Sequence, residues 1–169
     1  EDAFRANLHA RCADRILLVM GRFEARSFEE LFEGVRALPW EDFIGERTRF
    51  PVNGKCARSQ LMSVRDCQSI TKKAIVERLR GRYRTDWFVE DAETVSIDVA
   101  LHGDIAQLTL DASGTALNRR GYRTWNGEAP LRETLAAALV TLSPWRPGMP
   151  LHDPMCGTGT LMIEAAMRM

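Results

Sequence analysis

Long apolar runs are missing from this chain, and so is the layout of a leader sequence. No stretch of its 169 residues approaches the roughly 20 consecutive apolar residues that a helix needs to span a bilayer. The opening residues, Glu1 to Arg5, lack the basic-then-apolar order of a signal peptide. A hydrophobic share of 45% is still enough to form a core. We therefore expect a globular, cytoplasmic protein of one domain or two small ones.

Cysteine is scarce, and its spacing is not that of a metal site. The four cysteines are Cys12, Cys56, Cys67 and Cys156, without a Cys-x-x-Cys pair or a histidine-spaced cluster. Zinc sites in proteins are usually built from such pairs. We predict no metal site and expect reduced, buried thiols.

The formal net charge is zero, but the charged residues are unevenly distributed along the sequence. Residues 53–84 contain nine Lys or Arg and two acidic residues, whereas residues 85–111 contain seven acidic residues and no Lys or Arg. A second basic cluster lies at Arg119, Arg120 and Arg123. This segregation suggests a basic face that could meet phosphates. The alternative is a solvated helix surface followed by a charged linker.

Patterns in the first half of the chain predict a strand and a helix. Residues 16–20 are continuously apolar and predict a buried strand. Ser27 and Glu30 have the spacing of a capping box, in which each residue satisfies a backbone amide of the other. An apolar stripe at helical spacing follows and stops at Pro39, so we predict a helix between these points.

A second helix and a hairpin are predicted further along. The helix should run over residues 64–80 or 66–80, with Gly81 at its C-terminal cap and a basic outer face. Residues 93–111 alternate between apolar and polar on both sides of a turn at residues 102–104. This alternation predicts an antiparallel hairpin with one wet face.

Another helix is predicted after a loop that contains Pro130. It should begin near Gly127 with Pro130 in its first turn, and end at Ser143 and Pro144. Its predicted apolar stripe is Leu131, Leu135, Ala138, Leu139 and Leu142.

Residues 151–166 read as strand, loop and helix. A short apolar lead-in predicts a strand ending at Asp153, and Gly157 and Gly159 follow it in a turn. Glycines leave no side chain between the backbone and a ligand, and Thr158 or Thr160 can cap the helix. Two such glycines alone more often mark an ordinary tight turn. With the flanking residues, they predict a ligand-binding loop.

The string Asp-Pro-Met-Cys-Gly-Thr-Gly-Thr over residues 153–160 resembles the first motif of class I S-adenosylmethionine-dependent methyltransferases that modify amino groups of RNA and DNA. The resemblance implies S-adenosylmethionine as the cofactor, with the loop passing under its methionine half. The implied cofactor contacts are Asp153, Pro154, Cys156, Gly157, Thr158, Gly159 and Thr160. Ala129, Pro130 and Leu131 are further candidates, or are simply the start of a helix.

Residues 50–55, 66–79 and 117–123 look like the THUMP domain and exit linker of bacterial THUMP-containing RNA methyltransferases, which are similar to the ribosomal large-subunit guanine-N2 methyltransferases. The resemblance covers nearly the whole chain and implies a mixed α/β (α+β) fold. The implied parts are the end of an N-terminal ferredoxin-like region at 1–44, THUMP at 45–113, a linker at 114–128, and the first helix-strand-helix of a Rossmann-like methyltransferase domain at 129–169.

The same resemblance implies structured RNA, above all ribosomal RNA, as the partner. A THUMP domain meets the RNA backbone and its shape more than its sequence. The candidate RNA-binding residues are Lys55, Arg58, Ser59, Lys72, Lys73, Arg119, Arg120 and Arg123.

The implied reaction is methyl transfer to an exocyclic amine of a base that is drawn out of its stack. The first choice for this amine is N2 of guanine. Family members catalyse it with a loop of the form Asp or Asn, Pro, Pro, aromatic, which the 169 residues do not contain. We therefore expect no catalytic residue in this sequence and no activity of this chain alone. The alternatives are a stand-alone THUMP RNA-binding module without catalysis, and an N6-adenine methyltransferase.

Overall fold

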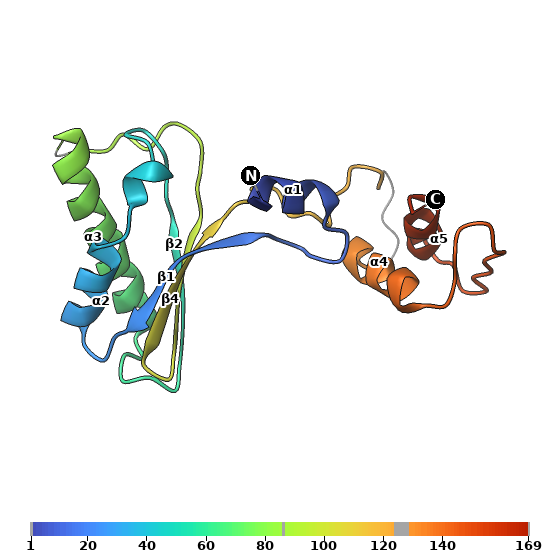
Figure 1. Cartoon of the computed structure of the whole chain (residues 1–169), viewed down its shortest axis with the longest axis horizontal. Helices are drawn as coiled ribbons and strands as arrows, with labels where there is room; N and C mark the ends of the chain where they lie inside the picture. Colours follow the sequence, from blue (N-terminus) through green and yellow to red (C-terminus); the bar gives the residue numbers. More distant parts are fainter. Residues whose placement is uncertain (1, 86, 124–128, 169) are drawn as a thin grey trace. The chain divides into compact units, whose positions relative to one another are not determined.

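A computed structural model of the chain describes residues 2–85, 87–123 and 129–168 (Figure 1). The chain divides into two compact units. Residues 17–114 form the first, called here the sheet unit, and residues 1–16 with 115–169 form the second, called the terminal unit. Within the described residues, no helix is both long and apolar enough to cross a membrane. The predicted mixed α/β fold class is confirmed.

The sheet unit contains a four-stranded sheet in the order β1-β4-β3-β2. Its strands are β1 (Leu17–Glu24), β2 (Val52–Ala57), β3 (Ile97–His102) and β4 (Ile105–Asp111). β2 is parallel to β3, and the other neighbouring strands are antiparallel. The predicted hairpin is confirmed, because β3 and β4 pair around the turn that joins His102 to Ile105. Alternate residues of β3 are buried, as the period of a strand requires, whereas β4 departs from this alternation at Thr109, which is buried along with Leu108 and Leu110.

Helices α2 (Phe28–Arg36) and α3 (Val64–Tyr83) cover one face of this sheet (Figure 1). A short 3-10 helix, η1 (Trp40–Asp42), follows α2. The predicted capping box is confirmed: the Glu30 amide donates to Ser27 Oγ at 3.2 Å, and the Ser27 amide donates to the Glu30 carboxylate at 3.3 Å. The core includes Leu31, Val35, Trp40, Phe50, Cys67, Ala74, Ile75, Leu79, Ile97, Val99, Leu101 and Leu108.

Two predictions in the sheet unit are wrong, one on the burial of β1 and one on the end of α3. β1 is not a buried strand but an edge strand, and Leu17 and Val19 are exposed on the sheet face opposite the helices. Helix α3 passes through Gly81 and ends at Tyr83, with Arg84 as its left-handed cap at φ +54°. A hydrogen bond from the Tyr83 hydroxyl to the carbonyl of Ile44, at 2.8 Å, stabilises the part of α3 that extends beyond Gly81.

The cysteines are all free, and only one is fully buried. Cys67 Sγ lies 3.8 Å from Cys56 Sγ, and burial raises the pKa of the Cys67 thiol to about 12. Cys12 and Cys156 are exposed, so the prediction of buried thiols is wrong for them. Over the described part of the chain, no group of three His, Cys, Asp or Glu side chains could hold a metal ion.

The terminal unit contains α1 (Asp2–His9), α4 (Glu133–Leu142) and α5 (Thr160–Ala166). The predicted stripe of α4 is wrong: Leu135, Leu139 and Leu142 are exposed, while its small residues and first-turn side chains are buried. The predicted start at Gly127 lies outside the described residues, and the predicted strand at 151–153 is not a strand. The buried set of α4 is Glu133, Thr134, Ala136, Ala137 and Val140.

An ion pair between α3 and η1 gives the sheet unit a pH-dependent contact. Arg78 Nε donates to the Glu41 carboxylate at 3.0 Å, and this hydrogen bond is the main cause that lowers the pKa of Glu41. Such a carboxyl contributes stability above its ordinary pKa of 4.5 and loses that contribution as pH falls through the lowered value. We expect E41Q to reduce the free energy of unfolding near neutral pH by up to about 1 kcal/mol.

Urea unfolding at neutral and acid pH checks this expectation. The difference between E41Q and wild type should disappear in acid, where both chains carry a neutral side chain at this position. E33Q, which changes the exposed carboxylate of the Glu33–Arg36 pair, is the control. A stability difference that is the same at every pH would contradict the ion-pair explanation.

Candidate functional site

The loop between Asp153 and α5 is held by hydrogen bonds between its own residues. Asp153 Oδ1 accepts from the Met155 amide at 3.1 Å, and the Gly159 amide donates to the Cys156 carbonyl at 2.7 Å. Gly157 and Gly159 have φ of +52° and +72°, a region that favours glycine. The sequence places glycine where the bend requires it, and α5 begins directly afterwards.

This loop forms one wall of a cavity of about 540 Å³. The opposite wall is formed by the segment before α4. Of the predicted cofactor contacts, those that line the cavity are Ala129, Pro130, Leu131, Asp153, Cys156, Gly157, Thr158 and Thr160. Pro154 and Gly159 do not line it, whereas Met155 and Leu161, which were not predicted, do. Two segments separated by more than 20 residues thus meet at one pocket.

Arg123 connects the two walls of this cavity. Its Nε donates to Glu133 at 2.7 Å and its Nη2 donates to the Leu131 carbonyl at 3.1 Å, both on the α4 side. The same Nη2 lies 3.0 Å from Thr160 Oγ1, and Nη1 lies 3.4 Å from Thr158 Oγ1, both on the loop side. The side chain is only 17% exposed and its donors have partners inside the protein, so the predicted RNA contact of Arg123 stays a prediction.

The charge of Glu133 depends on this contact. Burial is the largest single influence and works to raise the pKa of the Glu133 carboxyl, but the hydrogen bond from Arg123, a backbone hydrogen bond and the charges of Arg123 and Arg120 together outweigh it, and the pKa is lowered. Glu133 is therefore a carboxylate at neutral pH and remains a charged partner of Arg123.

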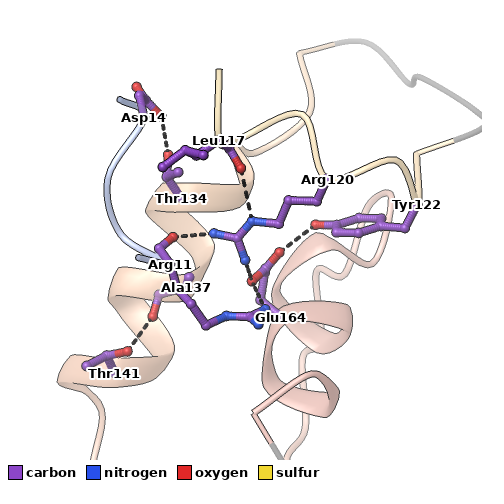
Figure 2. A network of polar contacts seen from close by, with 9 residues as sticks. All are labelled: Arg11, Asp14, Leu117, Arg120, Tyr122, Thr134, Ala137, Thr141 and Glu164. Carbon is purple, nitrogen blue, oxygen red and sulfur yellow. Dashed lines mark hydrogen bonds and ion pairs between the residues drawn. The ribbon is translucent and has the colours of Figure 1, made fainter. Parts of the chain in front are cut away.

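A second polar network centres on Glu164 of α5, which is fully buried (Figure 2). Its carboxylate accepts from Arg11 at 2.9 Å, from the Tyr122 hydroxyl at 2.9 Å, and from Arg120. Arg120 also donates to the backbone carbonyls of Leu117 and Arg11. Burial and the neighbouring carboxylate raise the pKa of Tyr122, so the hydroxyl stays a donor. The predicted RNA contact of Arg120 likewise stays a prediction, and its side chain is only 11% exposed.

Sequence reasoning assigned no role to Glu164, although a signal was available. It stands in an apolar helical run between Ile163 and Ala165. A lone acid at such a position is rarely buried without cationic or hydroxyl partners. The arginines that complete the set lie far away in the chain, so periodicity could not identify them.

The basic residues of the sheet unit do not share one face. Lys55 alternates with Gly54, and a side chain at position 54 would point at Gln68 of α3, so Lys55 projects from the opposite sheet face. Lys72 and Lys73 belong to the helix layer. The basic face that the charge segregation suggested therefore does not unite Lys55 with Lys72 and Lys73.

Several of these side chains already have partners. Lys72 pairs with Glu90 at 2.8 Å and lies over the ring of Phe50. Ser59 Oγ donates to the Ala57 carbonyl and accepts from the Asp104 amide, which holds the loop after β2. The remaining candidates, Lys55, Arg58, Lys73 and Arg119, are exposed.

Two family models match this chain. The THUMP domain model matches residues 25–111, more than half of the sequence. The chain belongs to the THUMP domain family. The model described as the RMKL-like methyltransferase domain matches residues 120–169, which include the loop and the cavity walls. The resemblance to THUMP-containing methyltransferases is confirmed, while the predicted domain boundaries, such as THUMP from residue 45, stay a prediction.

Two curated relatives of this THUMP protein cover nearly all of it. "Putative RNA methyltransferase YpsC" of Bacillus subtilis is 50% identical over 165 residues, which is 96% of this chain and 43% of that protein. The "Ribosomal RNA large subunit methyltransferase K/L" of Photobacterium profundum is 40% identical over 166 residues, 98% of this chain and 23% of that protein. The THUMP chain therefore spans less than half the length of these relatives.

Two solved structures are similar to the same THUMP chain. A "predicted N6-adenine-specific DNA methylase" from Listeria monocytogenes matches with a TM-score of 0.92 and 49% identity, over 96% of this chain and 43% of that one. SMU.472, described as "a putative methyltransferase complexed with SAH", matches with a TM-score of 0.89 and 44% identity, over 96% of this chain and 44% of that one. SAH is the demethylated product of S-adenosylmethionine.

Proposed function

We propose that this chain is the RNA-docking and cofactor-loop part of an S-adenosylmethionine-dependent methyltransferase that modifies a base amine of ribosomal RNA. The observation that carries the proposal is the cavity in the terminal unit, where most of the predicted cofactor residues meet. The names of the relatives support RNA, and ribosomal RNA in one case, as the substrate class. Guanine N2 as the target atom rests on the family resemblance alone.

The residues of the cavity fit the methionine half of the cofactor. The Asp153 carboxylate lines the wall and can bind an ammonium group, while the exposed backbone at Gly157 leaves room for close approach. Thr158 and Thr160 add hydroxyl groups, and Leu131 and Leu161 add apolar surface. The bound cofactor would supply an electrophilic methyl group on sulfur. The chain's own part is to bind and orient it.

Calorimetric titration of this chain with SAH tests the proposal. We expect saturable binding that is lost in D153A, because removal of the carboxylate leaves an ammonium ligand unpaired at the wall. Absence of binding by the wild-type chain would sink the cofactor assignment.

A transfer assay separates binding from catalysis. Incubation of the chain with labelled S-adenosylmethionine and ribosomal RNA should give no methylated RNA, since no group able to orient the target amine was identified in the sequence. Methyl transfer above background would show that the catalytic machinery was misjudged. RNA binding without any SAH binding would favour the alternative of a THUMP RNA-binding module.

Competition between RNA stem-loops and duplex DNA addresses the substrate. We expect the RNA to bind more tightly at every salt concentration, because in the proposed function the THUMP domain recognises the shape of structured RNA. Tighter binding of duplex DNA would favour the alternative of a DNA adenine methyltransferase.

A further inference from the structure

A second cavity, of about 490 Å³, lies next to the candidate cofactor cavity and is rich in arginine. Four arginines line it, Arg119, Arg120, Arg123 and Arg132, against the single carboxylate of Glu133. Pro130 and Leu131 line both cavities, so they form a shared wall. The cofactor site as proposed gives this basic cavity no role.

Two of these arginines have donors to spare. The guanidinium of Arg119 has no partner within the described ranges 2–85, 87–123 and 129–168, and the residue is exposed. Arg132 is 62% exposed and uses Nη1 to bind Asp14 at 2.7 Å. A guanidinium has five N–H donors, so most of those of Arg132 remain available to a ligand.

The other two arginines contribute charge more than contacts. Arg120 pairs with Glu164 and Arg123 pairs with Glu133 in the interior. These pairs hold both side chains in place where they line the cavity. A concave site with a surplus of positive charge attracts anions, and guanidinium groups match the oxygens of a phosphate.

We propose that this cavity binds a phosphate group of the RNA backbone, with Arg119 and Arg132 as the donors. The proposal rests on the proposed function, and it adds where the substrate strand lies: a phosphate held here touches the wall, Pro130 and Leu131, behind which the methyl donor would sit. The strand is therefore anchored next to the cofactor, in the terminal unit itself.

The test measures binding of a labelled ribosomal RNA hairpin by fluorescence anisotropy over a salt series, in wild type, R119Q, the double variant R119Q/R132Q and R5Q. Arg5 is an exposed arginine of α1 that lines neither cavity, so R5Q matches the charge change. We expect the slope of log affinity against log salt to be smaller in R119Q than in wild type, and smaller by about 1 in total in the double variant, because the two arginines share one phosphate. R5Q should keep the wild-type slope.

R119Q removes no contact within the described residues, so its effect on RNA binding cannot be ascribed to misfolding. Equal slopes in wild type and the double variant would overturn the proposal, as would an equal loss in R5Q. Binding of inorganic phosphate by the wild type and not by the double variant, with unchanged RNA slopes, would overturn the assignment to RNA. Titration with SAH in the same chains keeps the two proposals apart: equal RNA slopes with intact SAH binding sink only this one.

Discussion

Replacing Glu164 by alanine is expected to lower the stability of the terminal unit by about 3–5 kcal/mol. The carboxylate has no exposed surface and is the common acceptor for Arg11, Arg120 and Tyr122 (Figure 2). Without it, a guanidinium that is 11% exposed remains buried without its counter-charge, which is far more costly than loss of a surface pair. The hydrophobic cluster of this unit is small, so it has little to offset the loss.

Hydrogen exchange followed by mass spectrometry is the suitable measurement, because it resolves the two units. E164A should lose amide protection in α4 and α5 while the strands of the sheet unit, whose core is separate, keep theirs. E164Q should be nearly as damaging, since it keeps the shape and removes the charge. The control is E33A, an exposed carboxylate paired with Arg36, which should change stability by less than about 0.5 kcal/mol. Unchanged protection of α5 in E164A would show that the network does not hold the helix.

The sequence predicted those parts of the fold whose causes are local. The capping box of Ser27 and Glu30 depends on residues three apart, and the β3–β4 hairpin depends on alternation and a short turn. The bend at Gly157 and Gly159 was also readable, because only a few residue types adopt those backbone angles readily. Each of these features could be inferred without knowing what lies next to the segment.

The errors arose where a neighbour decides the outcome. Leucines at helical spacing predicted the buried face of α4, but in the structure that helix buries Ala136, Ala137 and Val140, and Val140 packs in one cluster with Ala165 of α5. The α3 boundary was set by a distant carbonyl, Ile44, and not by Gly81. Amphipathic patterns indicate that a face can be buried, not that it is.

The basic residues show the same limit for the candidate site. Counting charges along the chain put Arg120 and Arg123 with Lys55 on an RNA surface, yet the two arginines are internal partners of Glu164 and Glu133. A charge count cannot separate an arginine that faces solvent from one that neutralises a buried acid. The cofactor loop was recovered better because its residues are contiguous and its geometry is fixed by the backbone.

Replacing Arg123 by methionine is expected to weaken SAH binding by about tenfold, which corresponds to ~1.4 kcal/mol of lost preorganisation. Arg123 is the link between the α4 side of the cavity, at Leu131 and Glu133, and the loop side, at Thr158 and Thr160. Methionine is of similar length and apolar, so it fills the space but cannot bridge the walls. The cavity would then have to be ordered at the time of binding.

R123K is the informative partner variant, because a lysine keeps the charge near Glu133 but offers a single compact donor group in place of a planar fork. It should recover part of the affinity and not all of it. R146M serves as the matched control, since Arg146 is an exposed arginine that donates to the backbone carbonyls of Ser143 and Trp145 and lines neither cavity.

Titration calorimetry gives the affinities, and hydrogen exchange of the unliganded chains gives a readout independent of the ligand. If Arg123 positions the loop, R123M should show faster exchange at the amides of residues 156–160 before any SAH is added, because their anchor at Thr158 and Thr160 is gone. Unchanged exchange together with unchanged affinity would mean that the loop holds its shape through its own turn, from Cys156 to Gly159, and that Arg123 serves only to neutralise Glu133.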